Sequence, residues 1–184
     1  MQPAQKVLGG RKKVRVAIVQ TPPVFFDREK TIDRACQKIE VAARNGAELI
    51  VFTEAWIPGY PYWSEHWDSD LTRWASVRAQ YYDNAVIIPS EDTDRLCAAA
   101  AATSRKMIFP PTFPWLIKQM WIGRGGGSSI ISPLGVPLVP PTFGNTIIYA
   151  DCEADMIEAW KAIIDTSGHY SRPDIVSLDY KGGS

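Results

Sequence analysis

The chain has 184 residues, of which 46% are hydrophobic and 22% are charged, and its formal net charge is +0. This composition is typical of a soluble globular protein that can bury one sizeable core. No stretch approaches the ~20 apolar residues of a membrane span, and the N-terminal region has no apolar signal core. We therefore expect a cytoplasmic protein that neither spans nor binds a membrane.

The charge distribution argues against a nucleic-acid-binding surface. Such proteins usually carry a broad basic patch and a high isoelectric point, whereas the pI here is about 6.7. The basic cluster near the N-terminus is expected to be a solvated tail before the first strand. It consists of Lys6, Arg11, Lys12, Lys13 and Arg15.

Three cysteines, Cys36, Cys97 and Cys152, are odd in number and lack the spacing of a metal site. A disulfide framework or a zinc site is therefore not expected, and the thiols should stay reduced. Cys97 lies in an alanine-rich segment, where a small core residue is a better interpretation than a nucleophile.

The first third of the chain has the pattern strand, helix, strand. Residues 14–20 are rich in β-branched residues, and residues 48–53 contain a short apolar run. Between them, residues 29–45 repeat apolar side chains at helical spacing, and Gly46 follows where a C-terminal cap belongs. The apolar positions are Ile32, Ala35, Cys36, Ile39, Ala42 and Ala43. This pattern predicts a βαβ unit with parallel strands and a right-handed crossover, and so an α/β fold.

Glu54 follows the second strand directly and precedes a rigid turn that contains Pro58 and Gly59. Buried strands often present functional side chains at this position, and a carboxylate there is costly unless it has a partner or a role. Glu54 is therefore a candidate functional residue. The alternative is a structural carboxylate held by a neighbouring arginine or lysine.

Residues 60–74 combine aromatic and charged side chains, which suits a pocket wall or a subunit contact. A partly buried loop over the sheet edge is an equally good interpretation. His66 in this segment has no second histidine or cysteine at metal-binding spacing. Residues 91–102 are then predicted to form a helix.

The second half of the chain is less regular. Residues 107–127 show neither helical nor strand periodicity, and the glycine run 125–127 lacks the lysine and hydroxyl of a phosphate loop, so a turn is expected. Residues 128–132 and 136–139 should form a hairpin, and residues 145–150 another strand. Asp151 or Asp155 is expected to cap a helix that ends near Ile164, and residues 168–174 form a turn-rich tail.

Several of these segments together resemble the nitrilase branch of the carbon-nitrogen hydrolases. The N-terminal match includes residues 48–61, with the sequence ELIVFTEAWIPGYP. The C-terminal match includes GGSSIISPLG at residues 126–135, IYAD at 148–151 and GHYSRPD at 168–174. All of them occur in family order. A flavodoxin-like domain is disfavoured because no phosphate loop follows the first strand.

The resemblance implies a chemistry for small nitrile or amide-like substrates. In the family a cysteine thiolate attacks the nitrile carbon, a glutamate acts as general base, and a lysine stabilises the developing negative charge. Glu54 matches the family glutamate. Lys106 lies in a sequence context that resembles that of the family lysine, although a chance lysine at a helix end is an equally good interpretation. The chemistry needs no metal or other cofactor.

The resemblance also has a gap, because none of the three cysteines matches the family nucleophile. By the resemblance, the central strands and helices of the family are missing between about residues 102 and 125. We therefore expect residues 1–184 to form one αββα sandwich domain, truncated in its middle, with open edges or unburied apolar faces. Such a chain should have little or no activity. The alternative is a non-catalytic assembly or binding module, and a homo-oligomer is expected in either case.

Overall fold

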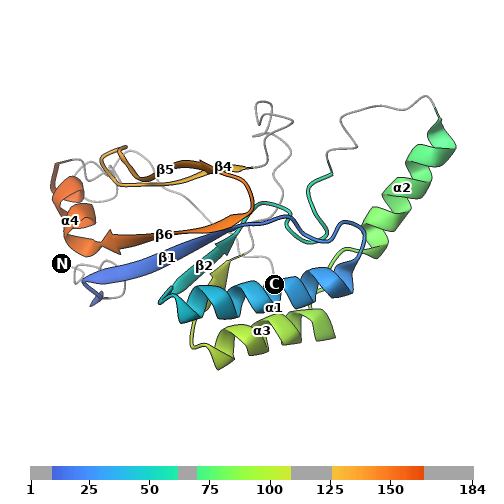
Figure 1. The fold of residues 1–184 in the computed structure, drawn as a ribbon, viewed down its shortest axis with the longest axis horizontal. Coiled ribbons are helices and arrows are strands. Elements are labelled where there is room, and N and C mark those ends of the chain that lie inside the picture. The colour runs from blue at the N-terminus through green and yellow to red at the C-terminus, as the bar shows by residue number, and fades with distance from the viewer. Residues whose placement is uncertain (1–9, 62–69, 109–125, 164–184) are drawn as a thin grey trace, which may run out of the picture.

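A four-stranded sheet lies between a pair of helices and a two-stranded hairpin (Figure 1). This computed structural model describes residues 10–61, 70–108 and 126–163. Its elements are β1 (Lys13–Gln20), α1 (Arg28–Arg44), β2 (Leu49–Phe52), α2 (Leu71–Asp83), α3 (Glu91–Ala102), β3 (Lys106–Ile108), β4 (Gly126–Ile131), β5 (Pro137–Phe143), β6 (Thr146–Glu153) and α4 (Ala154–Ile163).

The strand order in the larger sheet is β3-β2-β1-β6. Strand β1 is parallel to β2, and β2 is parallel to β3, which confirms the parallel pairing predicted for the βαβ unit. Strand β6 runs antiparallel to β1 along its whole length, from Lys13 opposite Glu153 to Gln20 opposite Thr146. The α/β fold class is therefore confirmed. The short strand β3 was not predicted, because its three residues are too few to show a period.

Helix α1 begins and ends as the sequence predicts. The Asp27 side chain accepts a hydrogen bond from the Lys30 amide at 3.0 Å, which caps the first turn. Gly46 follows the helix with φ +84°, a conformation that favours glycine. The face that packs on the sheet contains Thr31, Ile32, Ala35, Ile39 and Ala42, all buried. Of these, the apolar Ile32, Ala35, Ile39 and Ala42, together with side chains of β1 and β2, form the main core.

Helix α3 lies beside α1 on the same face of the sheet (Figure 1). Its first turn is closed by a capping box between Ser90 and Thr93, and Leu96 is its buried residue. Cys97 is exposed, so its interpretation as a core residue was wrong. Because a run of alanines follows Cys97, the sequence has no apolar stripe that would indicate which side of the helix faces α1.

The sequence did not predict α2, whose described side chains include none that is buried. The helix projects away from the sheet in Figure 1. Its first turn is capped by the Asp70 carboxylate, which accepts hydrogen bonds from the amides of Thr72 and Arg73. Without burial against a core, α2 needs no apolar stripe, so the main sequence signal of a helix is missing.

The hairpin of β4 and β5 packs on the opposite face of the sheet from α1 and α3. Gln20, the last residue of β1, joins the two layers. Its side-chain amide donates to the carbonyl oxygens of Thr142 at 2.9 Å and Gly144 at 2.8 Å, and its side-chain oxygen accepts from the Ser128 amide at 2.9 Å. The predicted hairpin is confirmed, and Gln20 was not recognised as its attachment point.

The described layers are therefore helices, a four-stranded sheet and a two-stranded sheet. Five large apolar side chains of the hairpin and its turn are 38% to 61% exposed, which agrees with the expected unburied apolar face. We call this surface the hairpin patch. It consists of Ile131, Leu134, Val136, Leu138 and Phe143.

Two of the four described residues of the basic N-terminal cluster do not lie in a solvated tail. Lys13 and Arg15 lie in β1 and form ion pairs with Asp151 at 3.3 and 3.2 Å. Lys13, together with Arg15, holds the pKa of the Asp151 carboxyl below its usual range. Asp151 lies within β6 and does not cap a helix, whereas Asp155 lies in the first turn of α4. These exposed pairs stabilise the fold little, but they place the basic side chains along the sheet.

We expect the Gln20→Leu variant to lose on the order of 2 kcal/mol of unfolding free energy, because two carbonyls and one amide lose their partner at a site that is 6% exposed. Urea unfolding followed by circular dichroism measures this loss. The matched control is Gln37→Leu on the exposed side of α1. Equal stability of the two variants would contradict the role of Gln20.

Candidate active site

Glu54 lies in a tight turn that follows the carboxyl end of β2 and is half-buried. The next residue, Ala55, has φ +48°, a left-handed conformation that is strained for alanine. The Gly59 amide closes the turn by donating to the Ala55 carbonyl at 2.9 Å. The backbone around the carboxylate is thus bent sharply away from the strand direction.

Trp56 anchors this turn to the end of β1. Its side chain is 2% exposed, and its indole nitrogen donates to the Thr21 carbonyl at 2.6 Å. Its ring packs against Phe52 with 4.8 Å between the ring centroids. Because Trp56 is two residues from Glu54, the anchor limits the positions that the carboxylate can occupy. Sequence reasoning recognised Glu54 but assigned no role to Trp56.

Gly59 permits the turn to pack closely. Its φ is +110°, and a Cβ atom at this position would lie 2.7 Å from the Phe25 ring. A side chain here would therefore meet both backbone strain and a steric clash. The glycine in the predicted Pro-Gly turn thus has a packing reason as well as a conformational one.

The structure does not bring Lys106 to Glu54. Lys106 is exposed and begins β3, where its Cα pairs with Leu49 at the start of β2. Glu54 follows the opposite end of β2, and the strand from Leu49 to Phe52 that separates the two residues spans roughly 10 Å at ~3.3 Å per residue. The pairing of Lys106 with Leu49 therefore favours the interpretation of Lys106 as a chance match to the family lysine.

None of the three cysteines follows a strand end beside Glu54. Cys36 lies in α1 with its sulfur 4.0 Å from the Arg95 carbonyl, and Cys97 is exposed on α3. Cys152 lies in β6 opposite Val14, whereas the strand that leads to Glu54 ends with Phe52 opposite Val19. Cys152 and Glu54 are therefore at opposite ends of the sheet.

Two of the thiols also lie in surroundings that disfavour the nucleophilic thiolate. Burial raises the pKa of the Cys36 thiol, and the nearby Asp33 and Glu40 carboxylates raise it further, against an opposing effect of Arg95. Burial likewise raises the pKa of Cys152, with a contribution from Asp151. A catalytic cysteine needs the opposite shift.

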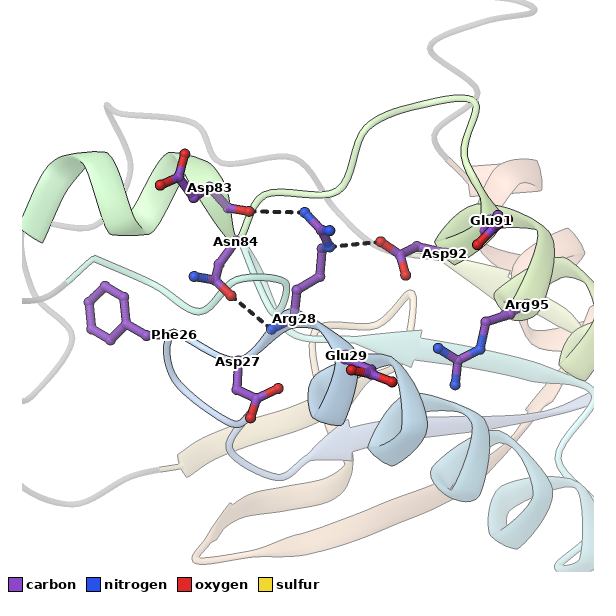
Figure 2. Close-up of a pocket in the computed structure, with 9 residues that line it drawn as sticks. All are labelled: Phe26, Asp27, Arg28, Glu29, Asp83, Asn84, Glu91, Asp92 and Arg95. Atoms are coloured by element: carbon purple, nitrogen blue, oxygen red, sulfur yellow. Dashed lines mark hydrogen bonds and ion pairs between the residues drawn. The ribbon is translucent and has the colours of Figure 1, made fainter.

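A polar hollow of about 410 Å³ lies where α1 begins, α2 ends and α3 begins (Figure 2). Arg28 in its centre forms an ion pair with Asp92 at 2.8 Å and donates to the Asp83 carbonyl at 2.9 Å. Asn84 accepts a hydrogen bond from the Arg28 amide at 2.9 Å. The side chains that line the hollow include no cysteine and neither Glu54 nor Lys106. Arg28 therefore joins three helices, and the hollow is separate from the Glu54 turn.

Some predicted features lie outside the described residues. These are Lys6, most of the aromatic segment with His66, residues 109–125 of the shortened middle, and the motif at residues 168–174. Among the residues that the structure does describe, no three His, Cys, Asp or Glu side chains are grouped to hold a metal ion. No helix in the described ranges is long and apolar enough to cross a membrane.

The Glu54 turn lies within a region that matches a known family. Residues 15–110, just over half of the chain, match the model of the carbon-nitrogen hydrolases. The chain belongs to this family. The matched region contains Glu54, Lys106, Cys36 and Cys97, and ends before Cys152.

Relatives of this carbon-nitrogen hydrolase include named nitrilases. An aliphatic nitrilase of Rhodococcus rhodochrous is 46% identical over 90 residues, which are 48% of this chain and 23% of the relative. An arylacetonitrilase of Aspergillus niger is 53% identical over 161 residues, which are 84% of this chain and 45% of the relative. The chain thus spans less than half the length of these relatives, and the resemblance to the nitrilase branch is confirmed.

Among solved structures, Saccharomyces cerevisiae Nit3, described as a member of branch 10 of the nitrilase superfamily, is similar with a TM-score of 0.48. It is 14% identical, and the match covers 87% of this chain and 97% of that one.

Thiol labelling tests the surroundings of the cysteines in this carbon-nitrogen hydrolase. We expect iodoacetamide to label Cys97 first at pH 7, because it is exposed. Cys36 and Cys152 have raised pKa values, so their thiolates form only at higher pH and their labelling should accelerate as the pH rises above 9. Peptide mass spectrometry measures the order. Faster labelling of Cys36 or Cys152 at pH 7 would contradict this account.

Proposed function

We propose that this chain is a nitrilase-like hydrolase domain that keeps the glutamate-bearing turn and has little or no hydrolytic activity by itself. The observation that carries the proposal is the position of the three cysteines, because none of them lies beside Glu54. The proposal treats residues 1–184 as one domain, shortened between about residues 102 and 125.

The family reaction requires three groups at one point. A thiolate adds to the nitrile carbon, one water releases ammonia and leaves a thioester, and a second water releases the carboxylic acid. A general base must take the proton of the thiol and of the attacking water, and a fixed positive charge must face the nitrogen. We assign the base to Glu54. Lys106, the first residue of β3, pairs with the start of β2, whereas Glu54 follows the end of β2. Its position therefore does not support a role as the positive charge that faces the nitrogen.

The loss of the nucleophile outweighs what the remaining groups can do. Removal of the attacking residue from a covalent mechanism costs several orders of magnitude in kcat, and general-base catalysis alone contributes about 10²–10⁴-fold. An anchored carboxylate without a thiol therefore leaves at most slow hydrolysis. The substrates that we propose for the parent reaction are small nitriles or amide-like molecules, in a cytoplasmic protein that needs no cofactor.

A second candidate function is a non-catalytic assembly or binding module. The hairpin patch favours it, because five large apolar side chains are exposed on one hairpin, and exposed apolar surface often marks an interaction site. On this alternative the chain is a homo-oligomer, and the Glu54 turn serves the stability of the fold.

We expect no ammonia release above the buffer rate when the purified chain is incubated with aliphatic and aryl nitriles. The Glu54→Gln variant, and a variant with Cys36, Cys97 and Cys152 all replaced by serine, should give the same background. Near-ultraviolet circular dichroism confirms that each sample is folded. Turnover by the natural chain that both variants abolish would contradict the proposal and identify a recruited cysteine.

A further inference from the structure

Helix α2 makes little contact with the other described elements. None of its described side chains is buried, and it packs along no other helix or strand in the described part of the chain. In Figure 1 it stands apart from the layer that α1 and α3 form. A helix of 13 residues without a buried face is only marginally stable in water. The order of α2 therefore depends on its own side chains and on contacts at its ends.

The stabilising contacts within α2 are local. The Asp70 carboxylate caps the first turn. The Arg78 guanidinium lies between two aromatic rings, 4.9 Å from the centre of the Trp74 ring and 5.4 Å from that of Tyr82, and donates to the Tyr82 hydroxyl at 2.9 Å. Side-chain pairs four residues apart add only a little to the stability of an isolated helix. These contacts are therefore weak support for a helix of this length.

The C-terminal end of α2 is held by Arg28, the first residue of α1. Its guanidinium donates to the carbonyl oxygens of Asp83 at 2.9 Å and Ala85 at 3.2 Å. The same group forms the 2.8 Å ion pair with Asp92 in the first turn of α3 (Figure 2). The Asn84 side chain donates to a carbonyl in the last turn of α2 and accepts from the Arg28 amide, both at 2.9 Å. We call these contacts the Arg28 latch.

The latch supplies what the end of α2 needs. The last carbonyls of a helix have no partner within the helix, and a positive charge beside them also interacts favourably with the helix dipole. A guanidinium has several donors in a planar fork, so it can bind two carbonyls and a carboxylate at once, which an ammonium group does less well. Arg28 thus joins the C-terminal end of α2 to the N-terminal ends of α1 and α3.

We propose that α2 is an arm that unfolds independently of the sheet, and that the Arg28 latch switches its helical order. With the latch closed, both ends of α2 are capped and the helix forms. With the latch open, its 13 residues lose the cap on their last carbonyls, and the helix unfolds while α1, α3 and the sheet keep their core.

The arm lies beside the segment that leaves the Glu54 turn. Burial raises the pKa of the Tyr81 phenol on α2, and the nearby Tyr82 and Tyr60 phenols raise it further. Tyr60 follows Gly59, whose amide closes the turn. Unfolding of the arm therefore removes a neighbour of this segment. The inference does not depend on catalysis, so ammonia release and the opening of the arm can fail separately.

Hydrogen exchange measured by mass spectrometry tests the latch. In the Arg28→Gln variant, the amides of residues 71–83 should exchange about tenfold faster or more, because two hydrogen bonds to carbonyls and one ion pair are lost. The amides of residues 32–42 in α1 should keep their rates. The matched control is Arg44→Gln at the opposite end of α1, where the guanidinium pairs with Glu40 at 3.6 Å. This variant should leave the exchange of residues 71–83 unchanged.

A second measurement needs no variant. In the natural chain, the exchange of residues 71–83 should be nearly independent of urea at low concentration, because opening of α2 alone exposes little surface. The exchange of residues 32–42 should accelerate with urea, because these residues include the buried face of α1. Equal urea dependence of the two segments would overturn the proposal. So would an Arg28→Gln variant that leaves residues 71–83 unchanged or accelerates both segments equally.

Discussion

The carboxyl end of β1 holds the two sides of the structure together. Gln20 uses its whole side-chain amide to bind the β4–β5 hairpin on one face of the sheet. The carbonyl of the next residue, Thr21, accepts the indole hydrogen of Trp56 and so fixes the turn that carries Glu54. The Trp56 bond is buried and the three Gln20 bonds are partly buried, so breaking one of them leaves polar groups without partners. The position of the carboxylate and of the hairpin therefore both depend on the central strand.

The sequence predicted those parts of the fold that local patterns specify. Helix α1 is indicated by the helical spacing of its apolar residues and by the glycine at its end, and β2 is indicated by its apolar run. Each signal lies within a few residues of sequence. The position of Glu54 after β2 followed from the same pattern. Helix α2 has no buried face, so its sequence shows no helical repeat of apolar residues. The alanine run of α3 does not indicate whether Cys97 faces the core or the solvent. The distance of Lys106 from Glu54 depends on strand register, which a single sequence does not reveal.

The frame of the proposed active site and its chemistry have different structural requirements. The frame needs only the parallel pair β1–β2, the Trp56 anchor and Gly59, and these lie within residues 15–110. The chemistry needs a thiolate, a base and a cation that converge from several strands. With two described strands in the second sheet and a length under half that of its relatives, the chain retains the Glu54 turn and exposes apolar side chains on the hairpin.

The central claim is that no cysteine of this chain can attack a nitrile beside Glu54. Intact-protein mass spectrometry after incubation with an aryl and an aliphatic nitrile tests it directly, because the family mechanism passes through a covalent thiol adduct. The account predicts an unchanged protein mass with both nitriles. A mass increase by one substrate or acyl group, located on Cys36, Cys97 or Cys152 and lost in the Glu54→Gln variant, would contradict it.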